Sequence, residues 1–169
     1  GERLGIRSVV ASNSHLGISP AGRPGIEIDF SDTETTVARI TDFHARNPIS
    51  AVLGVEDGSV EIAALVAEAL SLTSNKPQAI QDARLKHQCR GVLAAADLLS
   101  PPYRVLESGG MLTPKLIGEC EFPCVVKPVA LSGSRGVIRA DNANELSAAI
   151  VRIRRILERE NPSLDRSIL

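Results

Sequence analysis

Short apolar runs alternate with amphipathic stretches in the first half of the chain, which is the pattern of strands followed by helices. Two runs are β-branched or alternate apolar with acidic residues, and a third is almost continuously apolar, as in a strand buried on both faces. These predicted strands are residues 7–11, 26–30 and 49–55. The third ends at a turn that begins with Glu56, at the strand end where open α/β sheets place their ligands. Glu56 is therefore a candidate substrate contact, and a plain turn before a helix is the competing interpretation.

Two amphipathic helices are predicted beside these strands. Ser31, followed three residues later by Glu34, is a capping-box pattern that predicts a helix to about His44. The second helix covers 59–70, where apolar residues form one stripe. Strand and helix units of this size predict an α/β fold with a Rossmann-like parallel sheet.

The second half of the chain has a different pattern. One long helix rich in Ala and Leu is expected first, then a short helix, a β-hairpin and a long amphipathic helix. These predicted elements cover 78–99, 111–118, 122–130 with 136–140, and 143–159. The second half is therefore predicted to be a small α+β unit.

Composition excludes several classes of protein. The chain has 169 residues, 43% of them hydrophobic, and a formal net charge of −1, so a broad positive field for nucleic acid or an anionic membrane is not expected. Aromatic residues make up 2%, which argues against rows of bases stacked on aromatic rings. The three cysteines have no metal-binding spacing and are expected to be reduced in a cytoplasmic protein.

Lys127 is the residue that most clearly calls for a ligand. Lysine is scarce, and strand alternation places Lys127 on one face with Val125 and Val129, so that its ammonium projects from an otherwise apolar surface. A buried ammonium without a counter-charge is unfavourable. An anionic ligand would satisfy it.

A glycine-rich loop follows this lysine. Its residues are Ser132, Gly133, Ser134, Arg135 and Gly136. Gly and Ser allow backbone N–H groups to approach a phosphate, and Arg135 can add a fork of donors. The loop is not a P-loop, because the lysine precedes the glycines and strands are predicted on both sides. Taken alone, it also fits an ordinary flexible hairpin.

Together these residues resemble the ATP-grasp superfamily of carboxylate-amine ligases, which includes biotin carboxylase, glycinamide ribonucleotide synthetase and carbamoyl-phosphate synthetase. Residues 51–72 resemble the last strand and helix of the Rossmann-like domain that precedes the grasp fold. Residues 78–105 are similar to the family's linker helix, with Lys86 at its phosphate-binding lysine, although Leu85 replaces the common Asp before it. Residues 122–137 resemble the second lysine strand and the glycine-rich lid, with Lys127 as the lysine.

The resemblance implies a domain order. A Rossmann-like pre-ATP-grasp domain is expected over 1–76, a linker helix over 77–100 and the first ATP-grasp subdomain over 101–169. The first domain is expected to be truncated at its N-terminus, and the C-terminal half of the grasp fold, with the adenine hinge and the magnesium ligands, is expected outside this chain.

The resemblance also implies the chemistry. In the family, ATP phosphorylates a small carboxylate substrate, and an amine displaces phosphate from the acyl phosphate. Lys86, Lys127 and the loop of Ser132 to Gly136 would hold the phosphates, with Mg2+ as a further cofactor. No catalytic residue and no metal ligand is assigned within the chain, which is expected to be inactive alone. Homodimers are common among relatives, whereas nucleic acid and membrane partners are not expected.

Two other hypotheses stay open at this point. The chain could be a non-catalytic nucleotide-binding or assembly module in which the lysines and the loop bind phosphate without transferring it. It could also be an unrelated α/β domain in which Lys127 is simply paired with an acidic side chain.

Overall fold

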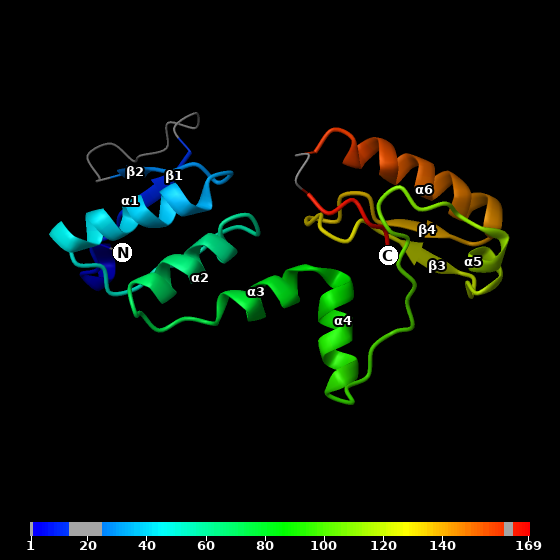
Figure 1. Cartoon of the computed structure of the whole chain (residues 1–169), viewed down its shortest axis with the longest axis horizontal. Coiled ribbons are helices and arrows are strands. Elements are labelled where there is room, and N and C mark those ends of the chain that lie inside the picture. The colour runs from blue at the N-terminus through cyan, green and yellow to red at the C-terminus, as the bar shows by residue number, and fades with distance from the viewer. Residues whose placement is uncertain (1, 14–24, 161–163) are drawn as a thin grey trace. The chain divides into compact units, whose positions relative to one another are not determined.

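The computed structural model describes residues 2–13, 25–160 and 164–169. The chain divides into two compact units, Gly1–Gln81 (unit 1) and Asp82–Leu169 (unit 2), each of which is described by itself (Figure 1). The division falls inside the predicted linker helix. In the part of the chain that the structure describes, no helix is both long and apolar enough to cross a bilayer.

Unit 1 combines a parallel strand pair with helices. Its elements are a 3-10 helix at Glu2–Leu4, β1 (Val10–Ser12), β2 (Gly25–Glu27), α1 (Thr33–Arg46), α2 (Val60–Ala69) and most of α3 (Pro77–Arg84). Strands β1 and β2 pair in parallel with Ala11 opposite Ile26. The core of unit 1 is aliphatic and consists of Ile28, Ile40, Ile62 and Val66. The first two of the three predicted strands are thus present, each three residues long and each overlapping only part of its predicted range, 7–11 or 26–30.

The predicted strand at 49–55 is not formed. The segment has no strand assignment, although Ile49 and Val52 pack against the unit 1 core. Leu53 is 84% exposed and Val55 is 93% exposed, so the apolar run is not buried on both faces. An apolar run becomes a strand only where a neighbouring backbone offers hydrogen bonds, and the described strand pair does not extend to it. The parallel sheet is therefore smaller than a Rossmann-like sheet.

The capping residue of α1 was predicted wrongly. Asp32, not Ser31, is the N-cap: its carboxylate accepts from the backbone N–H of Thr35 at 3.0 Å. Hydrogen bonds from the Thr35 side chain and, second, from this backbone N–H hold the pKa of Asp32 below its ordinary value. Ser31 donates from its backbone N–H and its hydroxyl to Asp29. Two neighbouring residues were both good caps by type, and the Asp29 turn selects the second.

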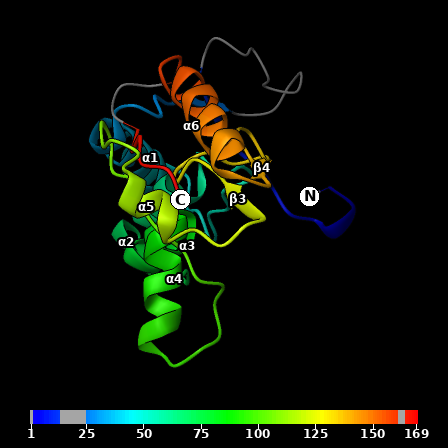
Figure 2. The ribbon, with the colours of Figure 1, turned by 90° about the vertical axis from the view of Figure 1, so that its right-hand side faces the viewer.

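Unit 2 packs a long helix on an antiparallel strand pair. Its elements are α4 (Lys86–Ala95), α5 (Pro114–Gly118), β3 (Cys124–Val126), β4 (Ile138–Ala140) and α6 (Ala143–Leu157). Strands β3 and β4 are antiparallel, which confirms the predicted hairpin, and α6 lies along them (Figure 2). The buried core of unit 2 includes the predicted stripe of α6, which is Leu146, Ile150, Ile153 and Leu157. The other core residues are Leu106, Val126, Leu131, Ala140, Ala149 and Ile168.

A segment far along the chain extends the strand pairing of unit 2. Ile168 exchanges backbone hydrogen bonds with Leu106 at 2.8 and 2.9 Å. On the other side, Lys127 and Leu169 exchange backbone hydrogen bonds at 3.0 and 2.8 Å. Residues 167–169 therefore run between the segment at Leu106 and the extension of β3.

The single helix predicted over 78–99 is two helices. Leu85 has an extended backbone (φ −83°, ψ 108°) and separates α3 from α4. No Gly or Pro marks this break in the sequence, so helix propensity gave no signal of it. Because Lys86 begins α4, the break sets where the lysine side chain lies. Overall the protein has a mixed α/β fold.

Candidate functional site

A hollow of about 250 Å³ lies in unit 2 and collects three cationic side chains. Its lining consists of Ala83, Lys86, Cys89, Arg90, Leu93, Leu99, Ser100, Pro101 and Lys127. None of these residues is acidic. The hollow therefore combines positive charge with an apolar wall, which suits an anion that carries an apolar group.

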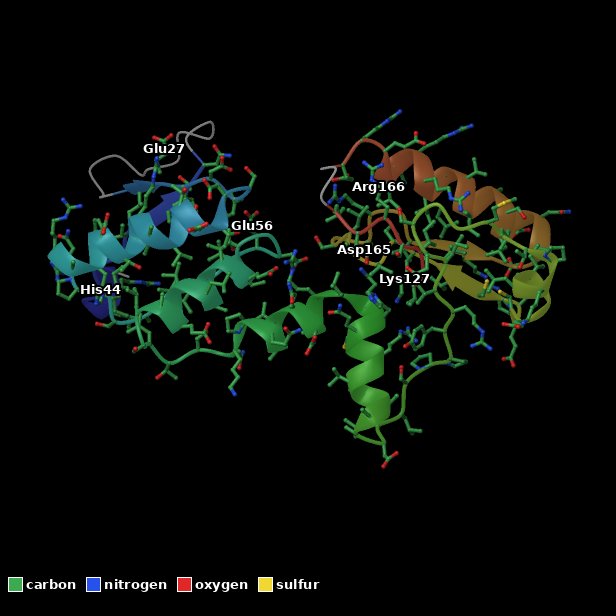
Figure 3. All side chains as sticks on the ribbon, viewed as in Figure 1. Glu27, His44, Glu56, Lys127, Asp165 and Arg166 are labelled. Atoms are coloured by element: carbon green, nitrogen blue, oxygen red, sulfur yellow. The ribbon has the colours of Figure 1, made fainter. Side chains whose placement is uncertain are left out.

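The backbone of Lys127 is held firmly, whereas its ammonium faces the hollow. Two backbone hydrogen bonds to Leu169 fix the residue, and its side chain lies beside the N-terminal end of α4 (Figure 3). Burial, and then the charge of Arg90, lower the pKa of Lys127 below its usual value. Among the residues that the structure describes, no carboxylate forms an ion pair with Lys127. Its surroundings therefore lack a counter-charge.

Two details around Lys127 differ from the sequence prediction. Val125 is 55% exposed, whereas Val129 is fully buried, so the two valines do not share one surface with the lysine. Strand β3 ends at Val126, and the alternation predicted from a longer strand does not continue regularly. Moreover, the surface around Lys127 is not otherwise apolar, because two more cations line the same hollow.

Lys86 reaches from α4 to the segment that leads into the glycine-rich loop. Its Nζ donates to the carbonyl oxygens of Val129 at 3.0 Å and Leu131 at 2.6 Å. Leu131 directly precedes Ser132, so this lysine ties α4 to the start of the loop. Lys86 and Lys127 thus line one hollow. The residues of the glycine-rich loop do not line it, and the loop is connected to Lys86 through the two carbonyls that precede it.

Arg90 is the lining cation that the sequence analysis missed. It lies one helical turn after Lys86. Its Nη1 donates to the carbonyl oxygen of Pro101 at 2.5 Å, and its guanidinium carbon is 5.4 Å from the centroid of the Tyr103 ring. A lysine-to-arginine spacing of four was the only available signal, and it is common on exposed helix faces.

The glycine-rich loop is a pair of tight turns. Arg135 N–H donates to Ser132 O, and Val137 N–H donates to Ser134 O, both at 3.2 Å. Three residues have positive φ: Gly133 at 62°, Ser134 at 58° and Gly136 at 76°. At Gly136 an added Cβ would lie 2.9 Å from Pro128 Cγ, so this position requires glycine for space as well.

Arg135 has a protein partner in this structure. Its Nη1 is 2.7 Å from Glu160 Oε1, beyond the end of α6, and the arginine side chain is 54% exposed. An exposed pair of this kind contributes only about 0 to 1 kcal/mol, so a stronger anionic ligand can displace the carboxylate.

Glu56 belongs to unit 1, whereas all the residues that line the hollow belong to unit 2. Its carbonyl oxygen accepts from the Ser59 hydroxyl and backbone N–H, both at 2.9 Å, and its own N–H donates to Ser59 Oγ. The residue is exposed at the start of α2. Its backbone thus has the competing role predicted for it, a turn before a helix.

Unit 1 has a hollow of its own, of about 310 Å³, with Glu68 and Lys76 among its lining residues. One acid and one base leave it without the positive excess of the hollow in unit 2. Within the described ranges 2–13, 25–160 and 164–169, no group of three or more His, Cys, Asp or Glu side chains is placed to hold a metal ion. The three cysteines are free thiols.

Comparison with known proteins gives a match to one family model and several solved structures of similar fold. Residues 120–169 match the family model of the ATP-grasp domain. No curated protein matches the sequence. An L-amino acid ligase from Bacillus licheniformis has a similar structure, with a TM-score of 0.73 and 25% identity over 90% of this chain and 37% of the ligase chain.

A second similar structure is the biotin carboxylase domain of the 2-oxoglutarate carboxylase from Hydrogenobacter thermophilus, a dimer in complex with MgADP, ADP and bicarbonate. The TM-score is 0.63 and the identity 19%, over 99% of this chain and 39% of that one. This chain thus spans less than two fifths of either solved chain. The resemblance drawn from the sequence is confirmed: residues 120–169 match the ATP-grasp domain, and the chain has a fold similar to part of an L-amino acid ligase and part of a biotin carboxylase domain.

Proposed function

We propose that this chain is the ATP-binding part of an ATP-dependent carboxylate-amine ligase that acts through an acyl phosphate. The observation that carries the proposal is the acid-free hollow that Lys86 and Lys127 line next to the glycine-rich loop. A cationic hollow beside turns that need positive φ fits a phosphate chain, because both ammonium and backbone N–H groups favour negative charge.

Each of the proposed binding residues has a different role in holding the phosphates, which follows from its position. Lys127 neutralises phosphate charge from a partly buried site, where an ion pair is stronger than in water. Lys86 adds positive charge and holds the carbonyls at the start of the loop. Ser132, Gly133, Ser134 and Gly136 offer backbone N–H groups and hydroxyls, and Arg135 exchanges Glu160 for a phosphate oxygen.

The reaction that this site would serve is phosphoryl transfer followed by acyl transfer. A carboxylate oxygen of the substrate attacks the γ-phosphorus, the bond to the β-phosphate oxygen breaks, and ADP leaves. The amine then attacks the acyl carbon and displaces inorganic phosphate. The chain's contribution to the first step is electrostatic and positional. Glu56 stays a predicted contact of the carboxylate substrate.

Magnesium is the cofactor that the family implies. The lining residues of the hollow include no carboxylate, and Mg2+ requires oxygen ligands. The hollow therefore does not fit a magnesium ion, and no magnesium ligand is assigned to it.

The activity of a whole ligase is a proposal that extends beyond this chain, which spans 37% and 39% of the two solved chains. We expect the 169-residue chain alone to bind ATP without hydrolysing it above background. Magnesium-dependent turnover by the purified chain would contradict this part of the proposal. A non-catalytic nucleotide-binding module would share the binding, and the two are separated by assaying amide formation in the protein that contains this chain.

Calorimetric titration with ATP tests the binding site. Lys127→Met is expected to weaken ATP binding by about tenfold or more, because it removes a charge-assisted contact. Lys115→Met is the matched control, since Lys115 is exposed on α5 and outside the hollow. Equal affinities of wild type and Lys127→Met would show that Lys127 does not hold the nucleotide.

A further inference from the structure

Arg90 is placed for more than helix packing. On α4 it follows Lys86 by four residues, so both side chains lie on the same face of the helix, and both line the hollow with Lys127. The resemblance to the ATP-grasp family supplied two lysines for this region. The arginine comes from the geometry alone.

The guanidinium of Arg90 is held in place by the segment that returns from α4. In this segment Pro101 O accepts a hydrogen bond from the guanidinium, and the Tyr103 ring lies against the cation. The Tyr103 hydroxyl in turn donates to His87 O at 3.4 Å, back on α4. The side chain is therefore pre-organised, and little conformational entropy is lost when it meets a ligand.

Most of its donors are left for a ligand. A guanidinium has five N–H groups in a planar fork. Over the residues that the structure describes, one of them donates to a protein acceptor, the carbonyl oxygen of Pro101, and no carboxylate pairs with Arg90. By contrast, Arg104, Arg135 and Arg139 of the same unit each pair with an acid.

Arg90 and Lys127 repel each other in the empty hollow. The charge of Arg90 is the second cause, after burial, of the lowered pKa of Lys127. Two neighbouring cations without an anion are unfavourable, and an oxyanion between them relieves both. The hollow is therefore electrostatically complementary to an anion with more than one charged oxygen.

We propose that Arg90 binds the phosphate chain of the nucleotide directly, as a third cation beside Lys86 and Lys127, and presents its planar fork to two phosphate oxygens. This inference rests on the proposed function, and it adds to it a residue whose planar fork matches the spacing of two phosphate oxygens as well as their charge. A lysine at this position would supply the charge without the fork.

NMR titrations of the full chain with ATP and with inorganic tripolyphosphate test the proposal, because they measure weak binding. Arg90→Gln is expected to weaken both ligands by about tenfold or more, and Arg90→Lys by about threefold to tenfold. Arg139→Gln is the control: it removes the same charge from an exposed pair with Asp141 and is expected to leave both affinities within about twofold of wild type.

The outcomes separate the two proposals. If Lys127→Met weakens both ligands while Arg90→Gln or Arg90→Lys binds them as wild type does, the role of Arg90 is overturned and the nucleotide site stands. A loss of ATP affinity with tripolyphosphate affinity intact also overturns it, because the contact would then be to the nucleoside. If wild type binds neither ligand, the proposed function itself fails. Thermal unfolding checks each variant, and Arg90→Lys decides should Arg90→Gln not fold.

Discussion

Lys127 illustrates a residue whose position favours binding over stability. Its pKa is lowered in the folded protein, so the folded state holds the lysine's proton less tightly than the unfolded state does. The shift therefore disfavours folding at neutral pH, and the penalty declines as the pH rises from the lowered pKa of the folded state to the ordinary pKa of the unfolded state. Lys127→Met is accordingly expected to leave the free energy of unfolding at pH 7 unchanged or raised, although it weakens ATP binding.

The pH dependence of ATP binding follows from the same residue. The ammonium is the binding form, and bound phosphate raises its pKa again, so ATP affinity is expected to fall, with proton uptake on binding, as the pH rises through the lowered pKa of Lys127. Calorimetry in buffers of different ionisation enthalpy measures that uptake. Lys127→Arg is expected to reduce the pH dependence, and Lys115→Arg to retain it. A wild-type affinity that stays flat up to pH 10.5, the ordinary pKa of lysine, would remove Lys127 from the site.

Gly136 is predicted to be the less replaceable of the two loop glycines. Gly136→Ala adds a Cβ at 2.9 Å from Pro128 Cγ and at φ 76°, whereas Gly133→Ala has the same backbone problem at φ 62° but open space. We expect a loss of about 2 to 3 kcal/mol for Gly136→Ala and about 1 kcal/mol for Gly133→Ala. Urea unfolding of the two variants measures the difference. Equal losses would mean that the contact with Pro128 does not constrain the loop.

At the residue scale, the sequence indicated which side chains could bind an anion but not which residues lie next to them in the fold. Lys127 stood out because a lysine in an apolar run needs a counter-charge. Arg90 did not, because its partners Pro101 and Tyr103 meet it only through the return of the chain after α4. The pairing of Arg135 with Glu160 was hidden for the same reason, since 25 residues separate them.

At the scale of elements, α6 is the helix that the sequence specifies most completely. Its N-cap residue, its apolar stripe and its packing on β3 and β4 all favour the same helix. The side chain of Asn142 accepts from the backbone N–H groups of Asn144 and Glu145, both at 3.1 Å. Glu145 reaches back to the N–H of Asp141 at 2.9 Å. These bonds satisfy donors that a helix start otherwise leaves free.

Removing this cap gives a measurable cost. Asn142→Ala is expected to lower the free energy of unfolding by about 1 kcal/mol. Asn144→Ala, in the first turn of the same helix, is expected to change it by less than about 0.5 kcal/mol. Chemical denaturation followed by circular dichroism measures both. A similar loss in the two variants would show that α6 does not depend on its side-chain cap.

Elements that local chemistry specifies were predicted well, and those that depend on distant backbone were not. Thr113 with Pro114 marked the start of α5, and Asn142 marked that of α6. The break at Leu85 has no Gly or Pro to mark it, and the strand predicted at 49–55 would have needed a hydrogen-bonding neighbour that the local sequence does not reveal.

At the scale of the whole molecule, the residues that line the hollow and those of the glycine-rich loop both belong to unit 2. We therefore expect ATP to slow amide hydrogen exchange in residues 82–169, most strongly at 129–137, and to leave unit 1 unchanged. Mass spectrometry of peptides from both units measures this. Tripolyphosphate is the comparison ligand, since it lacks the nucleoside. Protection of the segment around Glu56 would instead support a role for unit 1 in the site.

The strand pairing of residues 167–169 has a consequence for the order of folding. Residues 167–169 lie between the segment at Leu106 and the extension of β3. During translation both of these flanking segments are therefore synthesised before the residues that pair with them. Until translation reaches Ile168, the carbonyl and amide groups of Leu106 have no ladder partner. The backbone of Lys127 is thus secured late in synthesis, after α6 is complete.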